Sequence, residues 1–175
     1  MLSDLGYVEI GMDHFALTSD ALCASSINGK LHRNFMGYTA QKTSLMIGLG
    51  MSAISDSWGA FAQNVKTVKE YQNLVDQGEI PVFRGHILTH QDLEIRKHIL
   101  NLMCRFETSW DFNSMEPDLE ETLLKELEED HLIEIASNGV KVFEQGKPFV
   151  RNVCMAFDVY LQQKRTSERL FSLTV

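Results

Sequence analysis

Residues 133–142 read Ile-Glu-Ile-Ala-Ser-Asn-Gly-Val-Lys-Val, and this stretch decides the fold of the second half of the chain. Apolar and polar residues alternate in both arms, which is typical of strands with one buried face. The pair Asn138-Gly139 between the arms strongly favours a tight hairpin turn. We therefore predict an antiparallel hairpin at this position.

The segments on either side of the hairpin carry apolar residues at helical spacing. Thr89 is placed to cap a helix whose first turn holds Asp92. We predict three helices whose apolar faces consist of Ile95, Ile99, Leu102, Met103 and Phe106; of Leu119, Leu123, Leu124 and Leu127 after Pro117; and of Val150, Val153, Phe157, Tyr160 and Leu161 after Pro148. The order helix, helix, hairpin, helix is winged-helix-like.

The first part of the chain is rich in glycine and in short apolar runs. Residues 7–11 predict a short strand that ends at a glycine. Residues 45–54, Leu-Met-Ile-Gly-Leu-Gly-Met-Ser-Ala-Ile, are typical of a buried parallel strand with glycines where another group approaches the backbone. A core helix segment has the same composition, and periodicity does not separate the two. Residues 63–80 predict an amphipathic helix that ends near Gly78.

These patterns predict an α+β fold, mainly helical, in two domains. Residues 1–75 would form the last strands of a larger α/β unit and a linking helix, because two strands and glycine-rich loops do not close a sheet by themselves. Residues 76–175 would form the helical, winged-helix-like domain. The chain runs quickly into strand-like sequence, so we expect a piece of a longer protein. Exposed strand edges in residues 5–55 would favour homodimerisation.

Composition narrows the classes of function. The 175 residues carry a net charge of −8, which argues against a nucleic-acid partner because phosphate binding needs clustered Lys and Arg. Cys23, Cys104 and Cys154 lie far apart and form no C-x-x-C pair, so we predict a reduced, cytoplasmic protein without a disulfide framework or zinc site. No apolar run reaches the ~18 residues of a membrane span, and no signal-peptide pattern is present.

Two segments hold side chains suited to chemistry. Asp13 and His14 directly follow the first predicted strand, where a barrel enzyme places active-site residues in a βα loop; a capped, hydrogen-bonded loop is the alternative. Lys30, His32 and Arg33 lie close together in a polar segment, and an arginine holds a carboxylate with two parallel hydrogen bonds. His32 and Arg33 are therefore candidates for binding carboxylates, with a solvated surface loop as the alternative.

Six short segments together resemble one enzyme family in their order and spacing. They are Gly11-Met-Asp-His-Phe-Ala16, Leu31-His-Arg-Asn-Phe35, Gly37-Tyr-Thr39, Gly48-Leu-Gly-Met-Ser-Ala-Ile-Ser55, Ala62-Gln-Asn64 and Arg151-Asn-Val-Cys-Met155. On these segments the chain resembles the C-terminal half of the oxygen-independent coproporphyrinogen III oxidases, over essentially all of residues 5–170.

The resemblance implies the end of a partial radical S-adenosylmethionine barrel followed by a mostly helical domain. In this family a [4Fe–4S] cluster reduces S-adenosylmethionine, and the resulting radical abstracts hydrogen from a propionate of coproporphyrinogen III. Loss of carbon dioxide and an electron leaves a vinyl group, and two such steps give protoporphyrinogen IX for haem synthesis. The cluster needs three thiolates in one loop, and the Cys-x-x-x-Cys-x-x-Cys motif is absent here. We expect no metal in this chain and no activity from it alone.

The resemblance also assigns residues. Phe35, Met36 and Ile54 align with family residues that contact S-adenosylmethionine. Characterised members carry Gln where this chain has Met36, and Asp is common where it has Leu45. These departures leave open a paralogue that acts on another tetrapyrrole, and a winged-helix-like binding module without catalysis is a further alternative. Binding of substrate carboxylates by His32 and Arg33 is a separate inference.

Overall fold

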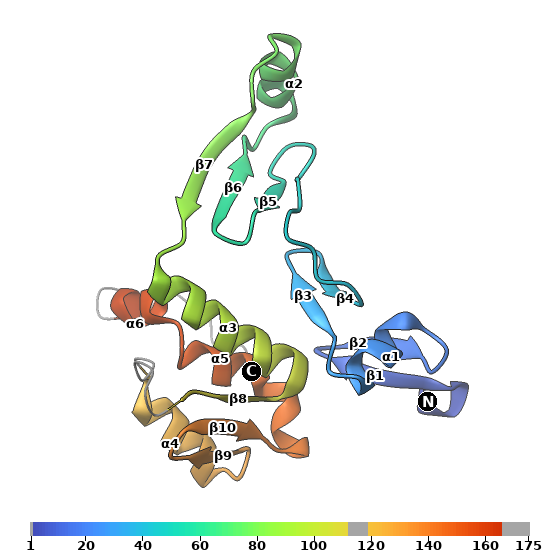
Figure 1. Ribbon diagram of the computed structural model, residues 1–175, viewed down its shortest axis with the longest axis vertical. Coiled ribbons are helices and arrows are strands. Elements are labelled where there is room, and N and C mark those ends of the chain that lie inside the picture. The colour runs from blue at the N-terminus through green and yellow to red at the C-terminus, as the bar shows by residue number, and fades with distance from the viewer. Residues whose placement is uncertain (1, 112–118, 166–175) are drawn as a thin grey trace. The chain divides into compact units, whose positions relative to one another are not determined.

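A computed structural model describes residues 2–111 and 119–165 of the chain. The chain forms two compact units, one made of residues 1–40 and 94–175 and the other of residues 41–93. Figure 1 labels their helices and strands. This grouping differs from the division into residues 1–75 and 76–175, which concerns separable domains and stays a prediction. The structure confirms the predicted mixed helix and strand fold.

The N-terminal segments of the first unit form two hairpins and a short helix. After the 3₁₀ helix η1 (Ser3–Leu5), strands β1 (Tyr7–Gly11) and β2 (His14–Leu17) pair antiparallel. Helix α1 (Ala21–Ile27) leads to strands β3 (His32–Asn34) and β4 (Gly37–Thr39), which also pair antiparallel. The first predicted strand is confirmed. The βα loop predicted to follow it is wrong, because the chain reverses into β2 through Met12 and Asp13, both with positive φ.

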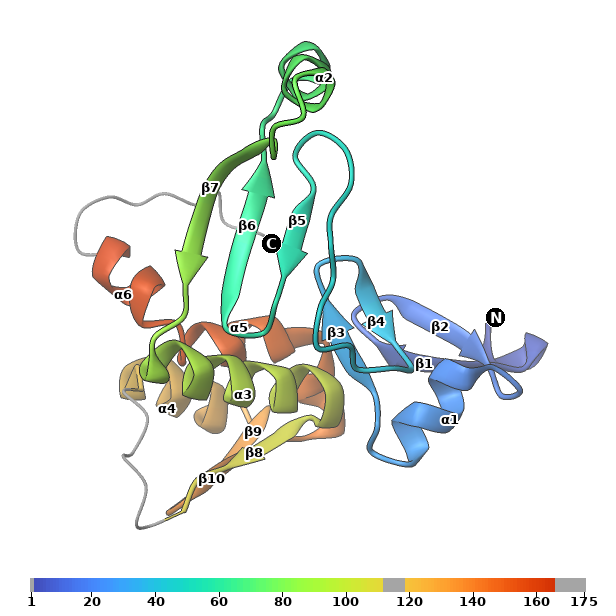
Figure 2. The ribbon, with the colours of Figure 1, turned by 45° about the horizontal axis from the view of Figure 1, so that its top comes forward.

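The C-terminal segments of the same unit contain the predicted hairpin. Helix α3 (His90–Arg105) is followed by β8 (Glu107–Ser109), α4 (Glu121–Glu129), β9 (Ile133–Ala136) and β10 (Gly139–Val142). Strand β10 pairs antiparallel with both β9 and β8, so the sheet order is β8-β10-β9. Figure 2 shows this sheet on one side of α3 and α5. The hairpin is confirmed, and β8 adds a third strand that the sequence analysis did not predict.

The last predicted helix is broken into three pieces. They are the 3₁₀ helix η2 (Glu144–Phe149), α5 (Val150–Met155) and α6 (Val159–Arg165). Pro148 lies inside η2 and does not begin an α-helix. The break before α6 is held by Asp158, whose Oδ1 accepts a hydrogen bond from the Leu161 amide at 2.9 Å. The predicted start of another helix at Pro117 lies outside the described residues.

One apolar core joins both ends of the first unit. Its largest fully buried side chains include Leu102, Ile133, Val150, Val153 and Phe157, from the predicted helical and strand faces. Buried residues from the N-terminal segments, Ile10, Ala16, Cys23 and Leu31, belong to the same cluster. None of the helices in the two described ranges combines the length and apolarity that a membrane crossing requires.

The second unit is a three-stranded antiparallel sheet with one helix. Strands β5 (Ile54–Asp56), β6 (Ala60–Asn64) and β7 (Val82–Ile87) lie in the order β5-β6-β7. Helix α2 (Val68–Asp76) begins at Thr67, whose hydroxyl accepts from the Glu70 amide, and is followed by Gly78 with φ of 76°. The helix predicted over residues 63–80 forms and ends near Gly78, but it starts only at Val68, because residues 63–64 belong to β6.

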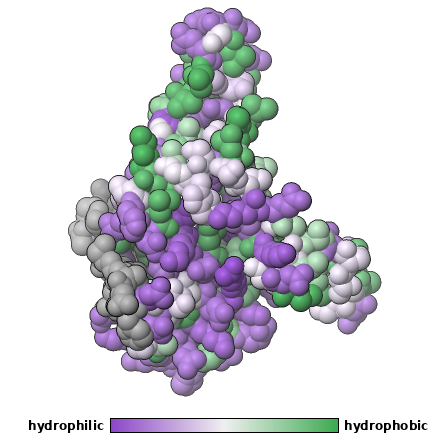
Figure 3. All heavy atoms as spheres, viewed as in Figure 1, coloured by the Kyte–Doolittle hydropathy of each residue, from purple (hydrophilic) through white to green (hydrophobic). Residues whose placement is uncertain are grey.

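The apolar run at residues 45–54 is neither a buried strand nor a helix. Only Met46 forms an isolated bridge, to Asp56, and Ile54 begins β5. The side chains of Leu45, Ile47, Leu49 and Met51 are exposed. Strand β7 is exposed along its whole length, with Phe83 and Ile87 among its apolar side chains. Figure 3 shows hydrophobic surface on this unit. Backbone ladders therefore hold the unit together more than an apolar core does.

Candidate functional site

The β3–β4 hairpin carries four of the five residues predicted to bind ligands. The register pairs His32 with Thr39 and Arg33 with Tyr38, so Phe35 and Met36 occupy the two-residue turn. Both turn side chains are exposed, Phe35 by 53% and Met36 by 87%. The Met36 amide donates a hydrogen bond to Asn34 Oδ1 at 2.8 Å, which fixes the backbone of the turn. An exposed aromatic and an exposed thioether on a fixed turn are accessible to a ligand.

Strand geometry separates His32 from Arg33. Successive side chains of a strand project to opposite faces, so these neighbours do not form one patch. Arg33 shares a face with its cross-strand partner Tyr38, and the Arg33 guanidinium carbon lies 4.7 Å from the centroid of the Tyr38 ring. Arg33 Nη1 is shielded from water and has no hydrogen-bond partner among the described residues. Of the two carboxylate candidates, Arg33 is the one with an unused donor.

Tyr38 is anchored from several directions. Its hydroxyl donates to the carbonyl oxygen of Met103 at 2.8 Å, which joins the hairpin to α3. The ring of His14 meets the Tyr38 ring edge to face at 5.2 Å between centroids. A methyl group on Gly11 would lie 2.8 Å from the Tyr38 hydroxyl oxygen, so only glycine fits there. Burial raises the pKa of Tyr38, and the Arg33 charge only partly offsets this effect.

Asp13 and His14 lie at the tight turn between β1 and β2. His14 Nδ1 lies 2.8 Å from the carbonyl oxygen of Met12, within the tight turn between β1 and β2. The hydrogen-bonded loop that the sequence offered as the alternative to a functional role fits His14.

The three cysteines do not fit an iron–sulfur cluster. Cys23 lies in α1, Cys104 in α3 and Cys154 in α5, and all three are buried. Burial raises the pKa of Cys104 to about 11 and that of Cys154 to about 12, although Arg33 lowers both. A cluster requires accessible thiolates on one loop. In residues 2–111 and 119–165, no three His, Cys, Asp or Glu side chains gather so as to hold a metal ion.

Ile54 lies in the second unit, at the end of a glycine loop that other side chains hold in place. The side-chain Nδ2 of Asn64 donates to the carbonyl oxygens of Gly48 at 3.0 Å and Gly50 at 2.8 Å. The Gly48 amide donates to Ser55 Oγ at 3.0 Å. A methyl group on Gly48 would lie 2.7 Å from the carbonyl oxygen of Ile54, so the predicted close approach is confirmed at Gly48.

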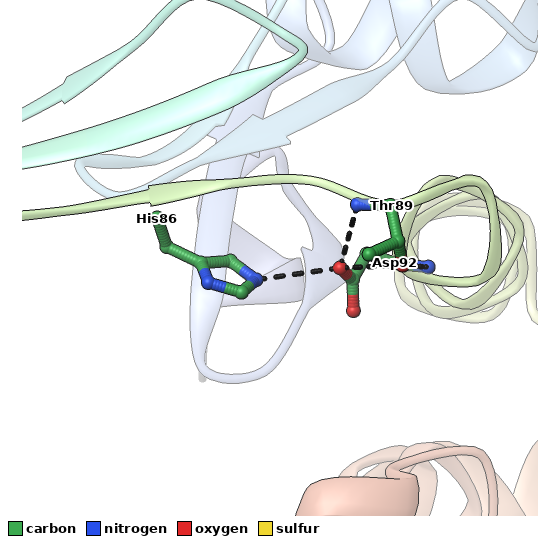
Figure 4. A network of polar contacts seen from close by, with 3 residues as sticks. All are labelled: His86, Thr89 and Asp92. Carbon is green, nitrogen blue, oxygen red and sulfur yellow. Dashed lines mark hydrogen bonds and ion pairs between the residues drawn. The ribbon is translucent and has the colours of Figure 1, made fainter.

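A polar cluster of the second unit has a structural role. Figure 4 shows His86, Thr89 and Asp92 around the start of α3. The Thr89 amide donates to Asp92 Oδ2 at 2.8 Å, and the Asp92 amide donates to Thr89 Oγ1 at 3.2 Å. This reciprocal pair is a capping box, with His86 Nε2 at 3.3 Å from the same carboxylate oxygen. The cap predicted at Thr89 is confirmed.

Two residues, one in each unit, hold segments that carry candidate residues, and the sequence alone assigns neither of them a role. Tyr38 and Asn64 both lie in segments that carried the family resemblance, which was the one available signal for them. Their partners are 65 residues away for Tyr38 and 14 to 16 residues away for Asn64, so no local pattern reveals the contacts.

Comparison with known proteins shows which enzymes the chain resembles. No family model matches the chain. The chain is 40% identical over 93% of its length to the oxygen-independent coproporphyrinogen III oxidase of Escherichia coli, and 37% identical over 99% to that of Synechocystis sp.. The chain is a relative of the oxygen-independent coproporphyrinogen III oxidases. It spans 37% of the length of the E. coli oxidase and 40% of the Synechocystis oxidase.

A solved structure supports the same relation. Coproporphyrinogen III oxidase from E. coli, described as a radical SAM enzyme, matches the chain with a TM-score of 0.81 and 38% identity. The match covers 91% of this chain and 39% of the oxidase. The relatives are longer than this chain, which matches only one part of them.

Proposed function

We propose that the chain acts as the C-terminal part of an oxygen-independent coproporphyrinogen III oxidase. The whole enzyme would convert two propionates of coproporphyrinogen III to vinyl groups by oxidative decarboxylation. The observation that carries this proposal is the TM-score of 0.81 to a radical SAM coproporphyrinogen III oxidase at 38% identity over 91% of the chain.

In this proposal the chain contributes walls of the ligand site. Phe35 and Met36 would contact S-adenosylmethionine from the β3–β4 turn, and their exposure supports this role. Ile54 would contact it from the glycine loop, whose backbone Asn64 holds in place. S-adenosylmethionine would supply the radical chemistry when it is bound beside a [4Fe–4S] cluster held elsewhere in the enzyme. Arg33 would bind a carboxylate of the tetrapyrrole. His32, the other candidate, projects to the opposite face of the hairpin and would not share that site.

The proposal includes the inactivity of this chain alone. Its three buried cysteines lie on separate helices and do not fit the cluster on which radical chemistry depends. Cytoplasmic location and homodimerisation stay predictions.

A paralogue with another tetrapyrrole substrate is the second candidate, favoured by Met36 where characterised members carry Gln and by Leu45 where Asp is common. A winged-helix-like binding module is the third. The succession α3, β8, α4, β9, β10 supports a winged-helix-like fold for this part. Helix α4 carries Glu121, Glu126, Glu128 and Glu129 against Lys125, which disfavours a nucleic-acid partner.

The decisive experiment uses the gene that encodes the chain. The proposal expects an upstream Cys-x-x-x-Cys-x-x-Cys motif in the same reading frame. The anaerobically reconstituted full-length protein should convert coproporphyrinogen III to protoporphyrinogen IX with S-adenosylmethionine. Conversion of a different tetrapyrrole would support the paralogue. Faster turnover of coproporphyrinogen III by Met36→Gln would show that Met36 contributes to the change of substrate. A gene without the cysteine motif, or a cluster-loaded protein without tetrapyrrole turnover, would contradict the proposal.

A further inference from the structure

Arg33 carries a buried donor that no acceptor satisfies among residues 2–111 and 119–165. Its guanidinium lies over the Tyr38 ring, and Nη1 is buried without any acceptor among the described residues. Burying a charged nitrogen without an acceptor is unfavourable, and buried polar groups in proteins are nearly always hydrogen-bonded. An orphan donor of this kind is suited to an acceptor that a bound ligand supplies.

The groups around Arg33 do not neutralise it. Tyr38, Cys104 and Cys154 are the titratable side chains whose electrostatic interaction with Arg33 is resolved. Burial raises the pKa of all three, to about 11 for Cys104 and about 12 for Cys154. Near neutral pH these three side chains are therefore uncharged, and none of them compensates the positive charge of Arg33.

The stacking of Arg33 on Tyr38 favours a planar anion as the ligand. The Tyr38 ring lies against one face of the guanidinium, and Tyr38 is itself held by the carbonyl oxygen of Met103. A stacked guanidinium presents its N–H groups at its edge, where a carboxylate accepts two parallel hydrogen bonds. Arg33 is only half-buried, so part of the side chain remains accessible from solvent.

We propose that Arg33, stacked on Tyr38, binds a carboxylate of a ligand, and that His32 does not share this site. The carboxylate belongs either to a propionate of a tetrapyrrole or to the methionine moiety of S-adenosylmethionine. The propionate source rests on the proposed function, whereas the carboxylate site itself does not. His32 is excluded because strand alternation directs its side chain to the other face of the hairpin.

Binding to the 175-residue chain tests the proposal with three probes. Coproporphyrin III carries the propionates, its tetramethyl ester lacks free carboxylates, and S-adenosylmethionine carries the other carboxylate. Arg33→Gln removes the charge and Arg33→Lys keeps it without the fork. Arg151→Gln is the matched control, since Arg151 is exposed on α5 in the same unit. Losing a charge-assisted hydrogen-bond pair should weaken carboxylate binding about tenfold or more.

The binding outcomes test the carboxylate site at Arg33 independently of the proposed enzyme function. Coproporphyrin binding that weakens in Arg33→Gln, stays unchanged in Arg151→Gln and is lost in the ester supports a propionate ligand. The same dependence for S-adenosylmethionine alone supports the carboxylate site and removes the tetrapyrrole from it. Binding of neither carboxylate probe, or binding that Arg33→Gln leaves unchanged, overturns the inference. Turnover by the full-length enzyme can still succeed in that case, so the proposed function is judged separately.

A ligand-free measurement guards against misfolded variants. If the Arg33 charge is uncompensated, Arg33→Gln should unfold at the same temperature as the wild type or a higher one, and its circular dichroism should be unchanged. A clear fall in the unfolding temperature would show that internal contacts satisfy Arg33, and would overturn the inference.

Discussion

Gly48→Ala should destabilise the second unit by about 2 kcal/mol, within the ~1–3 kcal/mol that overpacking usually costs. The added methyl group would lie 2.7 Å from the carbonyl oxygen, 2.8 Å from the carbonyl carbon and 2.9 Å from the amide nitrogen of Ile54. Comfortable contacts of a carbon atom are ~3.5 Å or longer, so backbone must move by roughly half an ångström or more. The neighbouring atoms are backbone at the start of β5, which cannot rotate away as a flexible side chain would.

Urea unfolding followed by tryptophan fluorescence measures this cost. The chain has two tryptophans, Trp58 in the second unit and Trp110 in the first. A Trp110→Phe background leaves Trp58 as the reporter of the unit that carries the mutation. Gly59→Ala is the matched control, because no atom lies within 4 Å of a methyl group placed there. The control should change stability by no more than ~0.5 kcal/mol. Equal free energies of unfolding for Gly48→Ala and Gly59→Ala would refute the close approach as the reason for glycine.

Three further predictions concern buried polar groups. Asn64→Ala should cost about 2 kcal/mol in urea unfolding, since two carbonyl acceptors of the glycine loop lose their donor, whereas exposed Asn73→Ala should cost almost nothing. Burial lowers the pKa of His98, so the unfolded state takes up a proton before the folded state as the pH falls. The free energy of unfolding should therefore decline below about pH 6.5. A titration of this free energy against pH should be flatter in His98→Gln. The raised pKa values of Cys104 and Cys154 predict that a thiol reagent at pH 8 modifies neither residue in the native chain and both in denaturant. Mass spectrometry maps the labelled residues. Fast modification of either thiol in the native chain would contradict the prediction.

Local patterns predicted the elements whose residues interact within a short stretch. The hairpin at Asn138-Gly139 and the capping box of Thr89 and Asp92 each depend on a few neighbouring residues, and both form as predicted. The break before α6 was missed because Asp158 lies within a continuous apolar periodicity. A pattern of apolar spacing continues across a cap, so it overestimates helix length.

The apolar run at residues 45–54 failed for a different reason. Its composition indicates burial, but the run contains Gly48 and Gly50, and Asn64 holds their carbonyl groups in an irregular loop. The apolar side chains of the run remain exposed in this chain. Hydrophobic composition reports that a surface is suited to burial and does not identify the polypeptide or ligand that would cover it.

The candidate site was predicted at the level of segments and not of side chains. His32 and Arg33 are adjacent in sequence and form a basic patch only in a loop conformation. Once β3 and β4 pair, Arg33 faces Tyr38 and His32 faces the other way. The pairing involves only three residues on each strand, too short for an alternating pattern to reveal it.

The anchoring of Tyr38 bears on how the chain divides into domains. A cut near residue 75 separates the Tyr38 hydroxyl from the carbonyl oxygen of Met103, and it removes Ile10 and Leu31 from the core that contains Leu102. Residues 76–175 alone should therefore unfold at a lower urea concentration than the whole chain, because they lose apolar burial and gain exposed core surface. A Trp58→Phe background of the whole chain leaves Trp110 as the reporter in both proteins, so that urea unfolding compares the two directly. Equal unfolding free energies would show that residues 76–175 form a self-sufficient domain. The β3–β4 hairpin that carries Arg33 would then add no stability to α3, to which Tyr38 joins it.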